Sequence, residues 1–92
     1  MNDLFANSVS ISDVYPNPAN NVAYIDLDIP TGLNDAQLIV SNLLGSEVKN
    51  FKINERTGKL RIDVGDLKNG LYFCTLKAQG QLLESKRLVV NH

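Results

Sequence analysis

The sequence predicts an all-β fold, an antiparallel β-sandwich of about seven strands, on three observations. Turn-forming groups of Pro, Gly, Asn and Asp recur roughly every 11–15 residues. Most of the segments between those turns alternate apolar and polar residues with the period of two that a strand requires. No window of about eleven residues carries the apolar stripe of an amphipathic helix. The pattern therefore favours short strands around one thin core.

Size and charge suit one small globular domain. The chain has 92 residues, of which 43% are hydrophobic and 21% are charged, so we expect an ordinary folded domain with a modest core. The net charge of -1 argues against nucleic acid as a partner. No apolar run approaches the ~20 residues of a membrane span, and the N-terminus lacks the features of a signal peptide. We expect a cytoplasmic protein or a piece of a longer exported one.

The N-terminal region predicts a linker followed by a strand and a stiff arch. Residues 1–8 are polar and aperiodic, so we interpret them as a linker remnant and residues 9–92 as the domain. The first strand is expected in "SVSISDVY", and "YPNPANN" follows it. Pro16 and Pro18 restrict their own φ and favour extended geometry in the residues before them. Side chains of Asn20 and Asn21 are expected to close this arch by bonding to the backbone.

Six further strands follow from the alternation of apolar residues. We expect them within residues 22–29, 36–44, 46–53, 58–67, 71–78 and 82–91. Counting the first strand, "SEVKNFKI" at residues 46–53 is the fourth of seven predicted strands. Its alternation changes phase between Val48 and the pair Phe51 and Ile53, which predicts a bulge or an edge position. The expected core residues are Ala23, Ile25, Leu27, Ile29, Leu38, Val40, Leu60, Ile62, Val64, Tyr72, Cys74, Leu76, Ala78, Leu88 and Val90.

Two glycine-containing pairs predict tight antiparallel hairpins. Gln79-Gly80 separates the last two predicted strands, and Leu44-Gly45 separates the third and fourth. Glycine supplies the positive φ that such turns require.

The segment "LKNGLY" indicates an immunoglobulin-like arrangement of the sandwich. Leu67, Gly70 and Tyr72 have the order expected at a tyrosine corner, where a tyrosine hydroxyl holds the crossover between two sheets. The alternative is that Tyr72 is a core aromatic residue with its hydroxyl at the rim. Both interpretations favour the sandwich.

The sequence contains no recognisable catalytic, cofactor or metal-binding constellation. The single cysteine, Cys74, is expected to be a buried apolar residue, and the single histidine, His92, is the last residue. There is no nucleophile motif, phosphate loop or zinc pattern, so we expect no enzyme, no cofactor and no metal. Asp26 and Asp28 lie on one face of a strand, where they contribute either to a calcium site or, as we favour, to a polar surface.

Exposed aromatic residues leave a carbohydrate-binding interpretation open. Tyr15, Tyr24 and Phe5 can form a sugar-stacking platform, although Tyr24 is better explained as cover for a half-buried sheet face. An immunoglobulin-like adhesive or carbohydrate-binding module of an extracellular protein is therefore the alternative function.

Four motifs in order resemble the C-terminal sorting domain of the type IX secretion system, in its type A form. They lie in "VYPNPANN", "LIVSNLLGSEV", "LRIDVGDLKNGLYFCTL" and "SKRLVVNH", and the resemblance extends from Val9 to Val90. Arg87 and the final Asn91-His92 depart slightly from the family pattern. The residues that match the family motifs are Tyr15, Pro16, Asn17, Pro18, Asn42, Leu44, Gly45, Leu67, Gly70, Tyr72, Lys86, Leu88, Val89 and Val90.

The resemblance implies a protein-export signal. Such domains direct an N-terminal cargo domain from the periplasm through the outer-membrane translocon to the cell surface or the medium. A sortase-like peptidase then cuts on the N-terminal side of the domain, for which "FANS" is our candidate region. The resemblance also implies that Met1 is a start added to an excised piece.

The last strand permits two interpretations. Its basic residues followed by Val89 and Val90 suit an edge strand that adds to a partner's sheet. We favour the alternative, in which Leu88 and Val90 complete the core. We further hypothesise that the arch and this strand form one recognition surface, because a rigid arch loses little entropy on binding.

Overall fold

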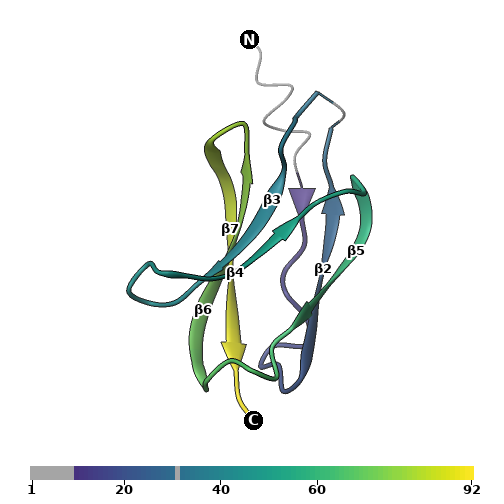
Figure 1. The fold of residues 1–92 in the computed structure, drawn as a ribbon. Helices are drawn as coiled ribbons and strands as arrows, with labels where there is room; N and C mark the ends of the chain where they lie inside the picture. Colours follow the sequence, from purple (N-terminus) through teal and green to yellow (C-terminus); the bar gives the residue numbers. More distant parts are fainter. Residues whose placement is uncertain (1–9, 31) are drawn as a thin grey trace.

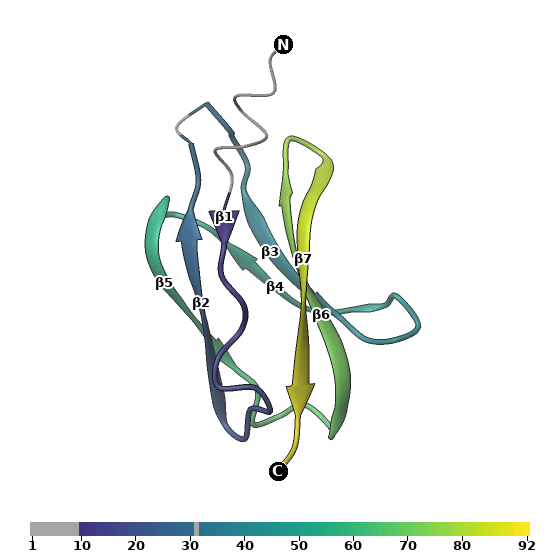
Figure 2. The ribbon, with the colours of Figure 1, turned by 180° about the vertical axis from the view of Figure 1, so that it is seen from behind.

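The computed structural model describes residues 10–30 and 32–92, which form two packed antiparallel sheets (Figures 1 and 2). The prediction of an immunoglobulin-like sandwich is confirmed. The predicted linker and the candidate cleavage region "FANS" lie outside the described residues. The seven strands within the described ranges are β1 (Ser10–Ile11), β2 (Val22–Asp28), β3 (Gln37–Ser41), β4 (Glu47–Lys52), β5 (Thr57–Asp63), β6 (Gly70–Ala78) and β7 (Gln81–Val90).

The strand order shows where the chain passes from one sheet to the other. One sheet has the order β1-β2-β5 and the other the order β4-β3-β6-β7. In the first sheet, Ile25 of β2 pairs with Leu60 of β5; in the second, Val40 of β3 pairs with Cys74 of β6. The chain therefore crosses between the sheets in the connections β2–β3, β4–β5 and β5–β6, as the sandwich class requires.

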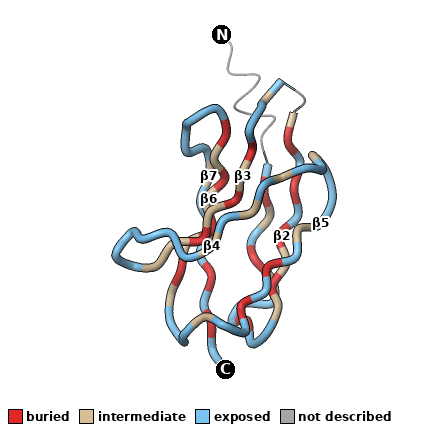
Figure 3. Tube along the Cα trace, in the orientation of Figure 1, coloured by how far each residue is buried: buried red, intermediate tan, exposed pale blue. Residues whose placement is uncertain are grey.

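The core lies between the two sheets and follows the predicted alternation. β2 and β6 each bury every second residue, which is visible as red bands along the strands in Figure 3. Ile25, Leu38 and Leu76 are completely buried, and each contributes about 1.5–3 kcal/mol by removing apolar surface from water. Among the described residues no polar or charged side chain is buried. Of the predicted core residues, only Leu60 is half-buried rather than buried.

The first strand ends earlier than predicted. Within the described residues β1 spans Ser10–Ile11, and the later Tyr15 returns to β2 through an isolated bridge to Tyr24. Between them, the hydroxyl of Ser12 accepts the backbone N–H of Asp26 at 2.8 Å. A side-chain oxygen thus replaces a backbone acceptor of the ladder, which interrupts the regular pairing.

The fourth predicted strand has the irregularity that its sequence indicated. Val40 pairs with Lys49 and Ser41 with Glu47, so Val48 is an extra residue in β4. This bulge shifts the side-chain phase and directs Phe51 and Ile53 toward the core. β4 is also an edge strand, so both predicted explanations apply.

Both predicted hairpins are present, but only the one at Gln79-Gly80 has a tight two-residue turn, because residues 42–46 separate β3 from β4. Gln79 and Gly80 have φ values of 53° and 77°, and Ala78 pairs with Gln81 across this two-residue turn. Two successive positive φ values are typical of the tight turn that matches strand twist.

Different connections between strands lie at the two ends of the sandwich. The arch, the β5–β6 connection and the end of β7 lie together at the lower end in Figure 1, and the β2–β3 and β6–β7 connections lie at the upper end. At the upper end Arg56 donates hydrogen bonds to the carbonyls of Pro30 and Leu33. No helix among residues 10–30 and 32–92 is long and apolar enough to cross a membrane.

Candidate functional site

The arch of residues 15–21 is held against the end of β7 by the side chain of Asn17. Its Nδ2 donates to the carbonyl of Arg87 at 3.0 Å, and its Oδ1 accepts from the N–H of Val89 at 2.8 Å. The amide therefore satisfies two backbone groups along the edge of β7, as a neighbouring strand would. The first and last sequence motifs are joined at this point.

Backbone hydrogen bonds continue this contact beyond Asn17. The N–H of Ala19 donates to the carbonyl of Val89 at 2.7 Å, and the carbonyl of Ala19 accepts from Asn91 at 2.9 Å. Ala19 is completely buried and forms a parallel bridge with Val90. The edge of β7 from 87 to 91 is thus already paired with the arch rather than open to a partner strand.

The arch is closed in a different way from the one predicted. The carbonyl of Asn21 accepts the N–H of Val64 at 2.9 Å, and the Tyr15–Pro16 and Asn17–Pro18 peptide bonds are both cis. Among the described residues, the bonds that close the arch come from Asn17 and from backbone groups. The predicted closure by side chains of Asn20 and Asn21 is therefore wrong, because β7 and the end of β5 supply nearer backbone partners.

Tyr15 connects the arch to the outer face of the three-stranded sheet. Its hydroxyl donates to the Asp26 carboxylate at 2.6 Å, and this bond is the main cause that raises the pKa of Tyr15. The rings of Tyr15 and Tyr24 have centroids 6.0 Å apart, and Lys59 Nζ lies 5.9 Å and 5.3 Å from them. The two rings expected to stack on sugar thus already contact a lysine.

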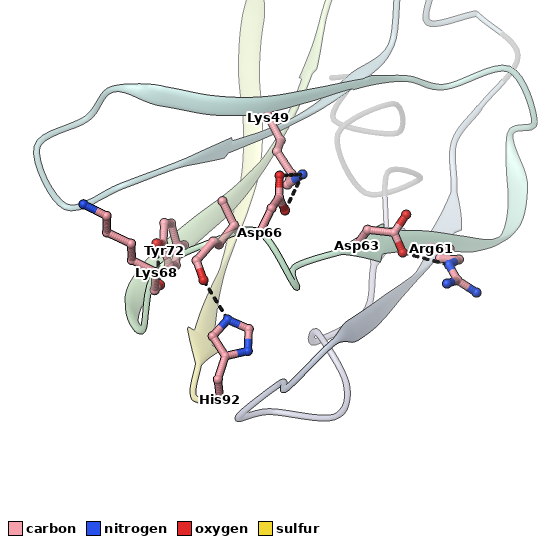
Figure 4. A network of polar contacts seen from close by, with 8 residues as sticks. Lys49, Arg61, Asp63, Asp66, Lys68, Tyr72 and His92 are labelled. Atoms are coloured by element: carbon pink, nitrogen blue, oxygen red, sulfur yellow. Dashed lines mark hydrogen bonds and ion pairs between the residues drawn. The ribbon is translucent and has the colours of Figure 1, made fainter.

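The third motif forms a tyrosine corner. The buried Tyr72 donates its hydroxyl to the carbonyl of Lys68 at 2.6 Å (Figure 4). The half-buried Leu67 packs against the core, and its N–H donates to Val64. Gly70, at φ 155°, begins β6. The structure therefore supports the tyrosine-corner interpretation, with the hydroxyl bound to the backbone as the corner requires.

The C-terminal residue lies against this corner. His92 Nε2 is 2.7 Å from the carbonyl of Leu67, a contact that Figure 4 shows, and the backbone N–H of His92 donates to Asn69 Oδ1. The first, third and last motifs therefore meet at one end of the sandwich.

The second motif lies apart, in the β3–β4 hairpin that projects sideways in Figure 1. Asn42 Oδ1 accepts from the N–H groups of Leu44 and Ser46, both at 3.0 Å, and Gly45 has a φ of 86°. The side chain of Leu44 is 90% exposed. Asn42 and Gly45 thus build a defined turn that presents a leucine to solvent.

The residues of the last motif have different surroundings. Leu88 and Val90 are buried in the core, which confirms their predicted structural role, and Val89 points outward. Lys86 Nζ lies 3.5 Å from Asp13 and 3.7 Å from Glu84. The strand therefore contributes both to the core and to the surface.

Sequence reasoning missed Ala19 and Asn69 and did not anticipate the role of Asn17. Ala19 is the one small residue between Pro18 and the two asparagines, which is a weak signal of close backbone approach. Asn69 precedes Gly70, as turn residues often do. The partner of Ala19 is Asn91, 72 residues later in the chain. The partner of Asn69 is His92, 23 residues later. Only the folded chain brings them together.

Cys74 and the carboxylates of Asp26 and Asp63 are further candidates for chemistry among the described residues. Burial raises the pKa of the Cys74 thiol to about 12, so it is a poor nucleophile near neutral pH. The described ranges contain no group of three or more His, Cys, Asp and Glu residues that could hold a metal ion. Asp26 binds Tyr15, and Asp63 pairs with Arg61.

Comparison with known proteins identifies the family. No curated protein matches the chain. The sequence pattern of the family described as "Secretion system C-terminal sorting domain" matches residues 13–91. This family is not one of enzymes, and the match does not favour the adhesive or carbohydrate-binding alternative. The chain therefore belongs to the family of type IX secretion C-terminal sorting domains and carries a sorting signal for export to the cell surface or the medium.

Proposed function

We propose that the domain directs a cargo joined to its N-terminal side through the outer-membrane type IX translocon. The cargo passes through the periplasm, and a sortase-like peptidase then removes residues 9–92 by cutting on their N-terminal side. The domain is recognised and cut but performs no catalysis itself. The family match over residues 13–91 supports this proposal.

We propose further that the translocon recognises the surface made by the arch, the β5–β6 corner and the end of β7. The observation that carries this proposal is the Asn17 side chain, which bonds to both Arg87 and Val89. It joins the first motif to the last one, because Arg87 and Val89 lie 70 and 72 residues after Asn17 in the chain. A surface fixed in this way loses little conformational entropy when a receptor binds it.

The motif residues divide by role within this proposal. Those in contact with the receptor are the exposed Pro16, Asn17, Pro18 and Val89. The buried Tyr72, Leu88 and Val90 hold the surface in place, as do Tyr15, Leu67, Gly70 and Lys86 through their local contacts. The β3–β4 hairpin, with Asn42, Leu44 and Gly45, forms a second and separate contact.

Export of a reporter tests the proposed surface. Residues 9–92 are fused behind a reporter that carries a periplasmic signal peptide, in a cell with the type IX machinery. The wild-type fusion is expected on the surface or in the medium, and the Pro16→Ala/Pro18→Ala fusion is expected to remain in the periplasm. Circular dichroism of the purified domains establishes that both variants are folded.

The third proline of the chain provides the matched control. Pro30 follows β2 at the opposite end of the sandwich, so Pro30→Ala should leave export unchanged. If the folded arch variant were exported as well as wild type, the arch would have a structural role only. A reporter exported equally well without residues 9–92 would overturn the sorting function itself.

A further inference from the structure

The large apolar side chains that are exposed among the described residues all belong to one of the two sheets and its hairpins. They lie in the four-stranded sheet or its hairpins and comprise Leu43, Leu44, Val48, Leu82, Leu83 and Val89. The three-stranded sheet instead presents the charged residues Asp26, Lys59 and Arg61. Apolar exposure that gathers on one sheet and its hairpins marks a surface for association with another protein.

The outer face of the four-stranded sheet is apolar at its centre. Ile39 alternates with the buried Leu38 and Val40, so it points away from the core, as do Leu71 and Phe73 in β6. These three residues are half-buried, and Leu71 pairs with Val89 of β7. Apolar side chains thus lie on both central strands, although the direct cross-strand partners of Ile39, Thr75 and Asn50, are polar.

One row of residues across this face has opposite charges at its two ends. Ser41 pairs with Glu47 on β4 and with Phe73 on β6, and Phe73 pairs with Arg87 on β7. Three strand spacings separate Glu47 from Arg87, which is about 14 Å. Both side chains are exposed, and neither forms an ion pair within residues 10–30 and 32–92.

We propose that this face binds a second copy of the chain, related by a two-fold axis parallel to the strands. Such an axis reverses the order of the row, so Glu47 of each copy faces Arg87 of the other. Phe73 then lies opposite Ser41, a bulky residue against a small one, within the ~10 Å that separates packed sheets.

The self-complementarity of the row is the reason for choosing a second copy as the occupant. A two-fold interface uses the same patch on both partners, so every contact occurs twice. The charges at opposite ends of the row satisfy each other only when the same row is presented in reverse. Sheet packing around Phe73 removes Ile39 and Leu71 from water, and the two ion pairs fix the register.

Sedimentation velocity of the 92-residue chain tests the proposal. The wild-type chain is expected to dimerise reversibly between about 5 and 500 µM, the range of a weak two-fold interface. Arg87→Glu and Glu47→Arg each place like charges together twice per dimer, so each should weaken dimerisation by roughly tenfold or more. The double variant Glu47→Arg/Arg87→Glu restores the pairing and should regain the wild-type dissociation constant.

The matched control lies on the other sheet. Arg61→Glu reverses an exposed arginine of β5 and should leave the dimer unchanged. Phe73→Asp should abolish dimerisation while circular dichroism stays that of the wild-type monomer. If Phe73→Asp does not fold, the three charge variants still decide the question. A chain that stays monomeric at about 500 µM, or a double variant as weak as the singles, would overturn the proposal.

Discussion

Asn17 and Val89 are joined by a hydrogen bond of 2.8 Å, although 72 residues separate them in the chain. The same Asn17 side chain donates to the carbonyl of Arg87, so it both accepts from and donates to the edge of β7. An amide is suited to this position because it carries one acceptor and one donor group side by side. The contact fixes the arch to the terminal strand.

Replacing Asn17 should lower stability. Asn17→Ala removes both hydrogen bonds and should reduce the free energy of unfolding by about 1–2 kcal/mol. Asn17→Asp keeps the acceptor for Val89 but places a carboxylate oxygen against the Arg87 carbonyl. This variant should therefore be no more stable than Asn17→Ala. Urea denaturation followed by circular dichroism measures the difference.

The neighbouring Asn20 is the control for this prediction. It is exposed in the same arch, and its replacement by alanine should change stability by less than about 0.5 kcal/mol. Equal losses from Asn17→Ala and Asn20→Ala would contradict the assigned role of Asn17.

The hydroxyl of Tyr72 should contribute measurably to stability. Tyr72→Phe removes the bond to Lys68 and leaves a carbonyl of the corner without that partner, which should cost about 1–2 kcal/mol of unfolding free energy. Tyr15→Phe also removes one hydroxyl bond, to Asp26, but at an exposed site, so it should cost less. Chemical denaturation of the two variants compares them directly, and a larger loss for Tyr15→Phe would disprove this ranking.

Cys74 should make stability fall in alkaline solution. Burial raises the pKa of its thiol from 9.0 to about 12, so the unfolded chain loses this proton at lower pH than the folded chain. The stabilisation is fully present below pH 9.0 and is lost progressively as the pH rises toward about 12.

A cysteine-free variant isolates this effect from other groups that titrate in the same range. The free energy of unfolding of the wild type should decrease between pH 9 and 11 more steeply than that of Cys74→Ala. Parallel pH profiles for the two proteins would be the contrary result.

The turn at Gly45 should not tolerate a side chain. Gly45 has a φ of 86°, so Gly45→Ala should destabilise the domain by about 1 kcal/mol through backbone strain. Gly32→Ala is a close control, because an added Cβ meets open space at both positions and only Gly45 has a positive φ. Thermal unfolding should show a lower midpoint for Gly45→Ala alone; equal shifts would rule out conformation as the cause.

The strand positions and the core were largely predictable from local patterns. Residues such as Leu27, Ile62 and Leu76 alternate with polar neighbours, and a period of two specifies which face of a strand is buried. The Gln79-Gly80 turn was equally predictable, because its conformation depends on the two residues themselves. The short β1 was not, since the bond between Ser12 and Asp26 that interrupts it joins different segments.

The sequence by itself determined the sandwich, its strands and, through four ordered motifs, the family. Only the tertiary structure decided that Asn17 binds β7, that His92 contacts the β5–β6 corner and that Glu47 and Arg87 share a row. The physical reason is that alternation encodes burial, whereas the choice of neighbouring strand depends on how distant segments pack and satisfy each other's backbone groups.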